Sequence, residues 1–257
     1  METTFGPALK EWRNVRRVSQ LDLGVLAGVS ARHISFLETG RSKPSREMVH
    51  HLSEYLEIPL SERNTLLHAA GFAATYRARD LSDDEMAQVR AAIDWTLERH
   101  DPFPALALDR HWTVVRANSS AKIMIAAIGL SEGESMLGAI TDTQRMEAAI
   151  ANWDEVAQHL IVRLRTESTF VGGDPILEAT ANRMVEERQT RWPARTESLQ
   201  AVVPIQFRAQ DMVLSLFSTI AQFGTAEDIA LADLRIEMYF PADDQTRQVL
   251  MAMATTT

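Results

Sequence analysis

Residues 19–40 read SQLDLGVLAGVSARHISFLETG and decide how the N-terminal part of the chain folds. Ser19 and Ser30 are residues that cap helix N-termini, because a serine hydroxyl accepts a hydrogen bond from the first free backbone N–H groups. Gly28 and Gly40 are residues that end helices, because glycine adopts the left-handed conformation without strain. The stretch therefore predicts a helix, a tight turn and a second helix.

The two helices, expected over 20–27 and 31–39, carry apolar side chains at helical spacing. Such a pair suits DNA recognition, in which one helix braces on the DNA backbone and the other presents its N-terminal residues to base edges in the major groove. The small side chain of Ala27 would allow the helices to approach closely. The apolar side chains expected to fix their angle are Leu23, Leu26, Ala27, Val29, Ile34 and Leu37.

Three further short helices are predicted around this pair. The first spans 7–17, the second follows a Ser45 cap, and the third runs from Ser61 to a stop at Gly71. Each has an apolar stripe, which in the second comprises Met48, Leu52 and Leu56. The first seventy residues are thus expected to form a compact all-helical domain.

Residues 19–40 resemble the phage-repressor, or XRE, family of helix-turn-helix regulators almost position by position. The resemblance implies an all-α, lambda-repressor-like domain that binds double-stranded operator DNA as a homodimer, with repression as the default mode. The positions that match the DNA-contacting residues of the family are Gln20, Ser30, Ala31, Arg32, His33, Phe36, Arg41, Lys43 and Arg46.

Arg32 is the expected base reader, because a guanidinium can donate two hydrogen bonds to guanine O6 and N7. Gln20 is expected to meet a phosphate, or else to be a solvated helix cap. Phe36 is expected to press on a thymine methyl, or else to be partly buried against neighbouring helices. The basic residues after the second helix match backbone contacts of the family, the alternative being a solvated basic surface. Arg13 and Glu38 match a largely buried salt bridge of the family.

Composition places the chain among globular proteins of the cytoplasm. The 257 residues are 46% hydrophobic and 24% charged, which favours two domains. No apolar run approaches the roughly 20 residues that span a bilayer, and the N-terminus lacks a signal sequence, so neither membrane association nor export is expected. Cysteine is absent, which excludes disulfides and thiol chemistry.

The net charge of −9 is unevenly distributed. Residues 1–70 hold nine Lys and Arg against eight Asp and Glu, whereas the rest of the chain holds 17 against 27. Because the acidic excess is confined to the second part, the first part can still bind phosphates.

We predict three parts: a DNA-binding domain over 1–72, a linker and connector helix over 73–104, and a sensing domain over 105–257. The connector helix is expected to begin at a capping box in residues 82–85, SDDE. Its position between the domains suits signal transmission. The helix has an apolar stripe of Met86, Val89, Ile93 and Leu97.

The third part changes its periodicity from helix to strand and back. Two strands, several helices and three strands predict an α+β domain with one antiparallel sheet covered on a face by helices. Asn152, with Glu155 three residues on, is expected to cap a helix. The predicted strands are 105–108, 112–117, 202–208, 212–220 and 229–240, and the predicted helices are 119–128, 144–151, 153–166 and 174–188.

The segments LDRHWTVVRAN (108–118), NWDEVAQHL (152–160) and FSTIAQFGT (217–225) extend the resemblance. Together with residues 30–46 and 63–72, they resemble the MmyB-like branch of the XRE family. This resemblance implies a PAS-like C-terminal domain that binds a small-molecule effector, with long-chain fatty acids among the suspected ligands.

A pocket is expected between the sheet and the helices of this domain. Arg163 or His159 would offer a cation to a carboxylate headgroup there, the alternative being an exposed helix edge. The apolar candidates have plain core positions as their alternative, because core and pocket walls share their composition. The candidate ligand-binding residues are Trp112, Trp153, His159, Leu160, Arg163, Phe207, Phe217 and Phe223, and Val114 is a further apolar candidate.

No phosphate-binding glycine loop, nucleophile elbow or metal-spaced histidine pair is present in the sequence. We therefore expect no enzymatic activity, no catalytic or metal-binding residue and no cofactor. Two alternatives stay open for the C-terminal domain. One is a haem or flavin sensor, with His100, His111 or His159 as an axial ligand, and the other is a module that binds only a partner protein.

Overall fold

The structure is a computed structural model, which describes residues 4–188 and 202–254. Contacts divide the chain into two compact units. The first contains the residues up to Arg79 together with Thr169–Gly173 and Thr225–Ala232, and the second contains the rest. Each unit is described by itself below.

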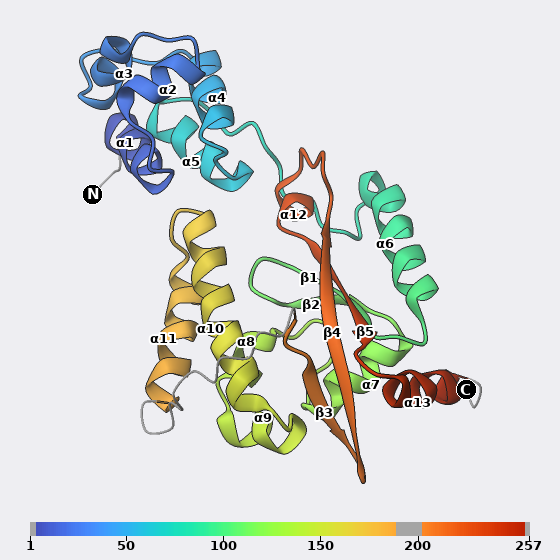
Figure 1. The fold of residues 1–257 in the computed structure, drawn as a ribbon. Helices are drawn as coiled ribbons and strands as arrows, with labels where there is room; N and C mark the ends of the chain where they lie inside the picture. Colours follow the sequence, from blue (N-terminus) through green and yellow to red (C-terminus); the bar gives the residue numbers. More distant parts are fainter. Residues whose placement is uncertain (1–3, 189–201, 255–257) are drawn as a thin grey trace. The chain divides into compact units, whose positions relative to one another are not determined.

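The first unit begins with five helices in the order that the sequence predicts (Figure 1). Ser19, Ser30 and Ser45 each accept a backbone N–H with their hydroxyl and so cap the second, third and fourth helices. Gly28 and Gly40 have φ of 63° and 73°, the left-handed conformation expected where these helices end. The helices are α1 (Phe5–Val15), α2 (Gln20–Leu26), α3 (Ala31–Glu38), α4 (Arg46–Tyr55) and α5 (Leu60–Ala69), and the short α12 (Ile229–Ala232) belongs to the same unit.

The core of this unit is close to the predicted one. Leu23, Ile34 and Leu37 are buried where α2 meets α3. Leu26 was expected among them, but its side chain is 52% exposed, because α2 ends at this residue and its last turn faces solvent. Of the stripe predicted for α4, Leu52 and Leu56 are buried, whereas Met48 is only partly buried and its neighbour Val49 is buried instead.

The second unit combines strands with helices (Figure 1). Its strands are β1 (Ala105–Leu108), β2 (Val114–Ala117), β3 (Ile205–Ala209), β4 (Met212–Gln222) and β5 (Arg235–Pro241). Its helices are α6 (Ala87–His100), preceded by the 3-10 turn Asp84–Met86, then α7 (Ser119–Ala127), α8 (Met136–Ile140), α9 (Thr143–Ala149), α10 (Trp153–Phe170), α11 (Pro175–Arg188) and α13 (Asp244–Ala254).

The five strands form one antiparallel sheet in the order β2-β1-β5-β4-β3. The long strand β4 pairs with both β3 and β5, and β5 inserts between β4 and the β1-β2 hairpin. The predicted α+β class with an antiparallel sheet is confirmed. Side chains alternate along each strand, so Glu237 and Tyr239 of β5 lie on one face together with Ser218 and Ile220 of β4.

The element boundaries differ from the predictions in several places. Residues 229–232, expected to begin a strand, form α12, and β5 begins only at Arg235. The helices α8 and α13 were not predicted, since short or terminal apolar runs do not reveal their period. The segment 202–204, expected to begin a strand, precedes β3.

The capping box expected at Ser82 is wrong. The Ser82 hydroxyl donates to Asp80 instead, and the 3-10 turn before α6 starts after Asp83 without a side-chain cap. The predicted apolar stripe of this helix is largely buried, with Ile93 fully enclosed, while Trp95 on the same helix is 60% exposed.

Candidate functional site

The predicted base-reading residues lie on α3, whose N-terminus is fixed by Ser30. The Ser30 hydroxyl accepts the backbone N–H of His33 at 3.2 Å, which places Ala31, Arg32 and His33 in the first turn. Arg32 is exposed, and its guanidinium lies over the Phe36 ring at 5.2 Å. This cation–π contact gives the long Arg32 side chain a platform one turn further along the helix.

Gln20 and Arg13 both bind Glu38 at the end of α3. Arg13 donates from Nε to Glu38 Oε1 at 2.6 Å and from Nη2 to Oε2 at 3.1 Å, so the predicted salt bridge is confirmed. Gln20 donates from Nε2 to Glu38 Oε2 at 2.7 Å. The hydrogen bond to Glu38 holds the pKa of Arg13 above its ordinary value although burial works against it. The start of α2 is thus tied to the end of α3.

The remaining basic candidates lie in the loop between α3 and α4 and at the first residue of α4. Lys43 is exposed, and Arg41 lies on the Phe36 ring at 5.9 Å. Arg46 donates to the Ala73 carbonyl at 3.3 Å and to the Thr75 hydroxyl at 3.2 Å. In this structure Arg46 therefore holds the segment that follows α5.

A cavity of about 470 Å³ lies inside the second unit between the sheet and helices α7–α10. This volume falls in the range of pockets that hold small molecules. Seven of the eight predicted ligand-binding residues line it, and Phe223 does not. Val114 is buried outside the lining. The predicted residues that line the cavity are Trp112, Trp153, His159, Leu160, Arg163, Phe207 and Phe217.

Most of the cavity wall is apolar, and flexible methionines contribute to it. Met124, Met136 and Met146 come from α7, α8 and α9. Because methionine is unbranched and adaptable, such a wall can follow the shape of an apolar ligand. The remaining apolar lining residues are Leu108, Ile125, Ile128, Ile140, Ile150, Val156, Val202, Val203, Ile205 and Ile220.

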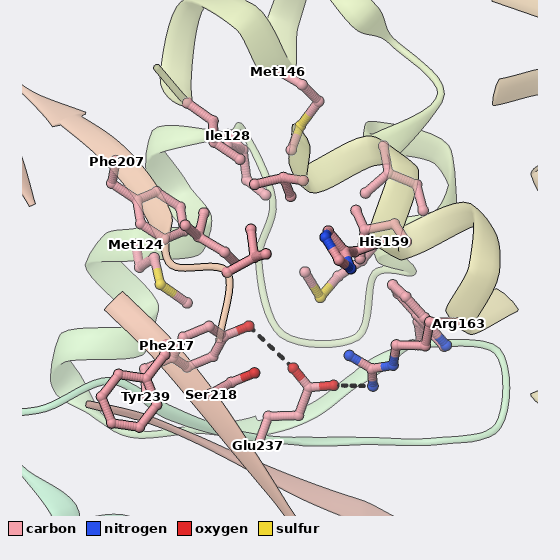
Figure 2. Close-up of a pocket in the computed structure, with 18 of the residues that line it drawn as sticks. Met124, Ile128, Met146, His159, Arg163, Phe207, Phe217, Ser218, Glu237 and Tyr239 are labelled. Atoms are coloured by element: carbon pink, nitrogen blue, oxygen red, sulfur yellow. Dashed lines mark hydrogen bonds and ion pairs between the residues drawn. The ribbon is translucent and has the colours of Figure 1, made fainter. Parts of the chain in front are cut away.

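The polar side chains of the wall face one another across the cavity. Figure 2 shows His159 and Arg163 reaching from α10 toward the sheet, where Ser218, Glu237 and Tyr239 lie.

The amide of Asn152, just before α10, was expected to be a helix cap, and it does lie 3.3 Å from Glu155. Its main role differs, because it also donates to the Pro204 carbonyl at 2.8 Å and accepts Gln206 N–H at 3.0 Å, which attaches β3 to the start of α10.

Arg163 is bound to carboxylates of the protein itself. It donates from Nε to Glu167 Oε1 at 2.8 Å, and its Nη2 forms a short ion pair with Glu237 Oε1. Arg235 donates from Nη1 to Glu167 Oε2 at 2.7 Å. The alternative of an exposed helix edge is wrong for Arg163, whose side chain is 23% exposed. We call Arg163, Glu167, Arg235 and Glu237 the ionic cluster.

Trp112 stands at the centre of the ionic cluster. Its indole N–H donates to Glu167 at 2.8 Å, and the guanidinium groups of Arg163 and Arg235 lie 4.5 and 5.2 Å from its ring centroid. The residue has φ of 58°, a conformation that is uncommon for a bulky side chain. The Asp109 carboxylate supports this turn by accepting the N–H groups of His111 and Thr113. The β1-β2 turn thus orients Trp112 toward α10.

Ionisation in the cluster follows from these contacts. Burial opposes the charged form of Glu167, but Arg235 and Arg163 outweigh it and hold the pKa of Glu167 below its usual range. Burial likewise opposes the charge of Arg163, yet Glu237 and Glu167 hold its pKa above the ordinary value. Burial and the neighbouring Glu237 raise the pKa of Tyr239 well above its ordinary value. Tyr239 is therefore a neutral phenol, which donates to Glu237 at 3.1 Å.

Sequence reasoning missed the two acids of the cluster. Glu237 lies in the strand sequence RIEMYFP, where it is buried between apolar neighbours. A single acid at an inward position of a strand was the available signal, because buried carboxylates are rare unless paired. Glu167 gave no such signal, because acids on helix surfaces are common.

The three histidines considered as axial ligands occupy different surroundings. His100 binds the Tyr239 carbonyl at 2.8 Å, and His111 binds Asp174 at 3.0 Å. Of the three, His159 alone lines the cavity. Within residues 4–188 and 202–254, no group of three His, Asp or Glu side chains is arranged to hold a metal ion.

Comparison with protein families agrees with this two-part architecture. Residues 4–66 match a helix-turn-helix domain, and residues 89–253 match the MmyB-like transcription regulator ligand binding domain. The chain is thus a DNA-binding transcription regulator that carries a ligand-binding domain. It belongs to the MmyB-like transcription regulator family, because that domain covers more than half of the chain.

A search of curated proteins finds no match for the chain. In the part of the chain that the structure describes, no helix combines the length and the apolar composition needed to cross a bilayer.

Proposed function

We propose that this protein is a cytoplasmic, non-enzymatic repressor whose affinity for operator DNA changes when a small molecule of the fatty-acid class binds in its C-terminal domain. The observation that carries the proposal is the cavity of about 470 Å³ with a mainly apolar wall, which lies inside the domain matched by the family. A long apolar chain fits such a wall, and the methionines allow it to adapt.

The DNA side of the proposal is supported by Arg32, which is exposed in the first turn of α3, and by the basic loop after that helix. We propose homodimeric binding to an inverted repeat, in which half-site centres lie about one helical turn, ~34 Å, apart. Footprinting on selected operator fragments tests this. Protection of a single half-site at every protein concentration would contradict the dimer, and raised expression of target genes on deletion supports repression.

Mass spectrometry of the small molecules that copurify with the native full-length protein tests the ligand side. We expect an amphiphile with a long apolar chain to be released on denaturation. Two variants of β4 make a matched pair: Ile220→Trp enlarges a side chain of the cavity lining, whereas Val213→Trp enlarges one outside it, and the two positions are exposed to a similar degree. Ile220→Trp should lose the amphiphile and Val213→Trp should retain it. Equal retention, or the absence of any bound molecule from both the native protein and its denatured extract, would contradict a ligand in this cavity.

A further inference from the structure

Two charged side chains line the cavity, Arg163 and Glu237, and they neutralise each other. The other two members of the ionic cluster, Glu167 and Arg235, lie outside the lining. The ionic cluster contains two guanidinium groups and two carboxylates, joined in the order Glu237, Arg163, Glu167 and Arg235 by contacts of hydrogen-bonding length. Tyr239 adds a neutral hydroxyl that donates to Glu237. His159 also lines the cavity, and its side chain is exposed to solvent.

This balance works against an anionic ligand. A free carboxylate would be the third negative group beside the two positive ones of the ionic cluster, whose side chains are at most 23% exposed. Arg163 already binds Glu167 and Glu237, so a carboxylate that approaches Arg163 comes close to Glu237, whose side chain is 4% exposed. Two carboxylates beside one guanidinium repel each other, and this repulsion favours the uptake of a proton by one of them.

An uncharged polar group meets no such obstacle. Figure 2 shows the Ser218 hydroxyl beside Glu237 and Tyr239. The Tyr239 hydroxyl donates its hydrogen bond to Glu237, and its oxygen keeps a lone pair that can accept a second one. Ser218 and His159 can each exchange a hydrogen bond with an ester, alcohol or amide without disturbing an ion pair.

We propose that the cavity selects an uncharged molecule with a long apolar part and one neutral polar end, such as an ester, an alcohol or an amide of the fatty-acyl class, and discriminates against the free carboxylate. This inference rests on the proposed function and narrows its ligand class.

The test compares probes that share one chain and differ only at the polar end: laurate, methyl laurate and lauryl alcohol. Their affinities for the full-length protein are measured by calorimetry at pH 7.5 and pH 5.5, in two buffers that differ in ionisation enthalpy. We expect the ester and the alcohol to bind at least about tenfold more tightly than laurate at pH 7.5, with no proton uptake. Laurate should gain affinity at pH 5.5 and take up about one proton, because it or Glu237 must be neutral in the complex.

Two variants test the charge balance itself. Glu237→Gln leaves the ionic cluster with one positive charge in excess, so laurate should gain about tenfold or more while the ester changes little. Glu167→Gln alters the balance equally and should give the same reversal if Glu237→Gln does not fold, as judged by circular dichroism. Glu98→Gln, an exposed change outside the lining, is the control that should leave all three affinities unchanged.

The outcomes separate this inference from the proposed function. Laurate binding as tightly as the ester at pH 7.5, without proton uptake, overturns the neutral-ligand inference and leaves a fatty-acid regulator in place. If none of the three probes binds, both the inference and the proposed ligand class are wrong.

Discussion

In the DNA-binding unit, we expect one side chain to recognise bases and another to bind phosphates. Arg32 is exposed in the first turn of α3, and Lys43 is exposed in the loop that follows. Arg32→Ala should relax the preference at one base pair, by about 1–3 kcal/mol of discrimination. Lys43→Ala should weaken binding to all DNA sequences alike. It should also reduce the slope of log K against log salt concentration by about one. Binding titrations against an operator library at several salt concentrations measure both, and identical effects of the two changes would contradict these roles.

Gly24 is a residue whose missing side chain matters for the helix-turn-helix. A Cβ at this position would lie 2.5 Å from the Val29 carbonyl oxygen in the turn between α2 and α3. Gly24→Ala should therefore lower the free energy of unfolding of this unit by about 1–3 kcal/mol, although alanine is the better helix former.

The matched control is Gly138→Ala in α8, where a Cβ would have no heavy atom within 4 Å. There the same substitution should be neutral or stabilising by up to about 1 kcal/mol. Urea unfolding followed by circular dichroism compares the two variants. Equal stability of the Gly24→Ala protein and the wild type would show that α2 and the turn are not closely packed.

At the scale of elements, prediction succeeded where a local signal specifies the structure. Serine caps and helix-ending glycines located α2 and α3 within a residue, because these signals act on their own backbone. The start of β5 was missed since residues 229–232 are as apolar as a strand, and only their packing distinguishes α12.

The cavity lining was largely foreseeable, whereas the ionic cluster was not. Aromatic residues such as Trp112 and Phe207 pointed to the space between sheet and helices. The pairing of Arg163 with Glu237 joins positions 74 residues apart, and no pattern within one element reports such a contact. From the sequence, Arg163 was a cation available to a ligand. In the structure, its charge is already neutralised by Glu167 and Glu237.

The start of α11 is an element that should respond to pH. Asp174 accepts the N–H groups of Ile176 and Leu177 at 2.9 and 3.2 Å, and also binds Arg110 at 2.9 Å and His111 at 3.0 Å. Burial opposes its charge, but the hydrogen bonds and Arg110 outweigh burial and hold the pKa of Asp174 below its usual range. Because the folded-state pKa is depressed, the stabilisation is present above the unfolded pKa of about 3.9 and is lost as the pH falls through the folded value.

Asp174→Asn should accordingly destabilise the second unit at pH 7 by about 1–3 kcal/mol, and by less at pH 3. Thermal unfolding at the two pH values measures the difference. Asp211→Asn, an exposed change in the turn between β3 and β4, should have no effect at either pH. A penalty for Asp174→Asn that stays constant with pH would exclude a role for its charge.

At the scale of the whole molecule, charge is divided between the two functions. Residues 1–70 are nearly neutral and carry the exposed basic loop, whereas the acidic excess lies in the remainder of the chain. Since DNA is uniformly negative, this division favours contact through the helix-turn-helix and keeps the ligand-binding domain away from phosphates.

Regulation requires that a ligand bind more tightly to one arrangement of the molecule than to another, because only a difference in affinity shifts an equilibrium. We expect α6, which precedes the ligand-binding strands in the chain, to transmit this difference. A charge at Ile93 would not test the idea, because the side chain is fully buried and its replacement by aspartate would unfold the domain. Trp95 is the better position, since it is 60% exposed and contributes little to the core of its own unit.

Operator affinity of the full-length protein should change by roughly 5- to 150-fold when methyl laurate fills the cavity, the usual range of coupling between two sites. Trp95→Ala should keep the fold, the ligand affinity and the unliganded operator affinity, but should reduce this change. Ile123→Ala, at an equally exposed position on α7 outside the lining, should retain the full change. Fluorescence anisotropy with a labelled operator, with and without ligand, measures all three proteins. If ligand that demonstrably binds leaves wild-type operator affinity unaltered, ligand control is wrong, and if Trp95→Ala responds as fully as the wild type, the signal does not pass through the exposed face of α6.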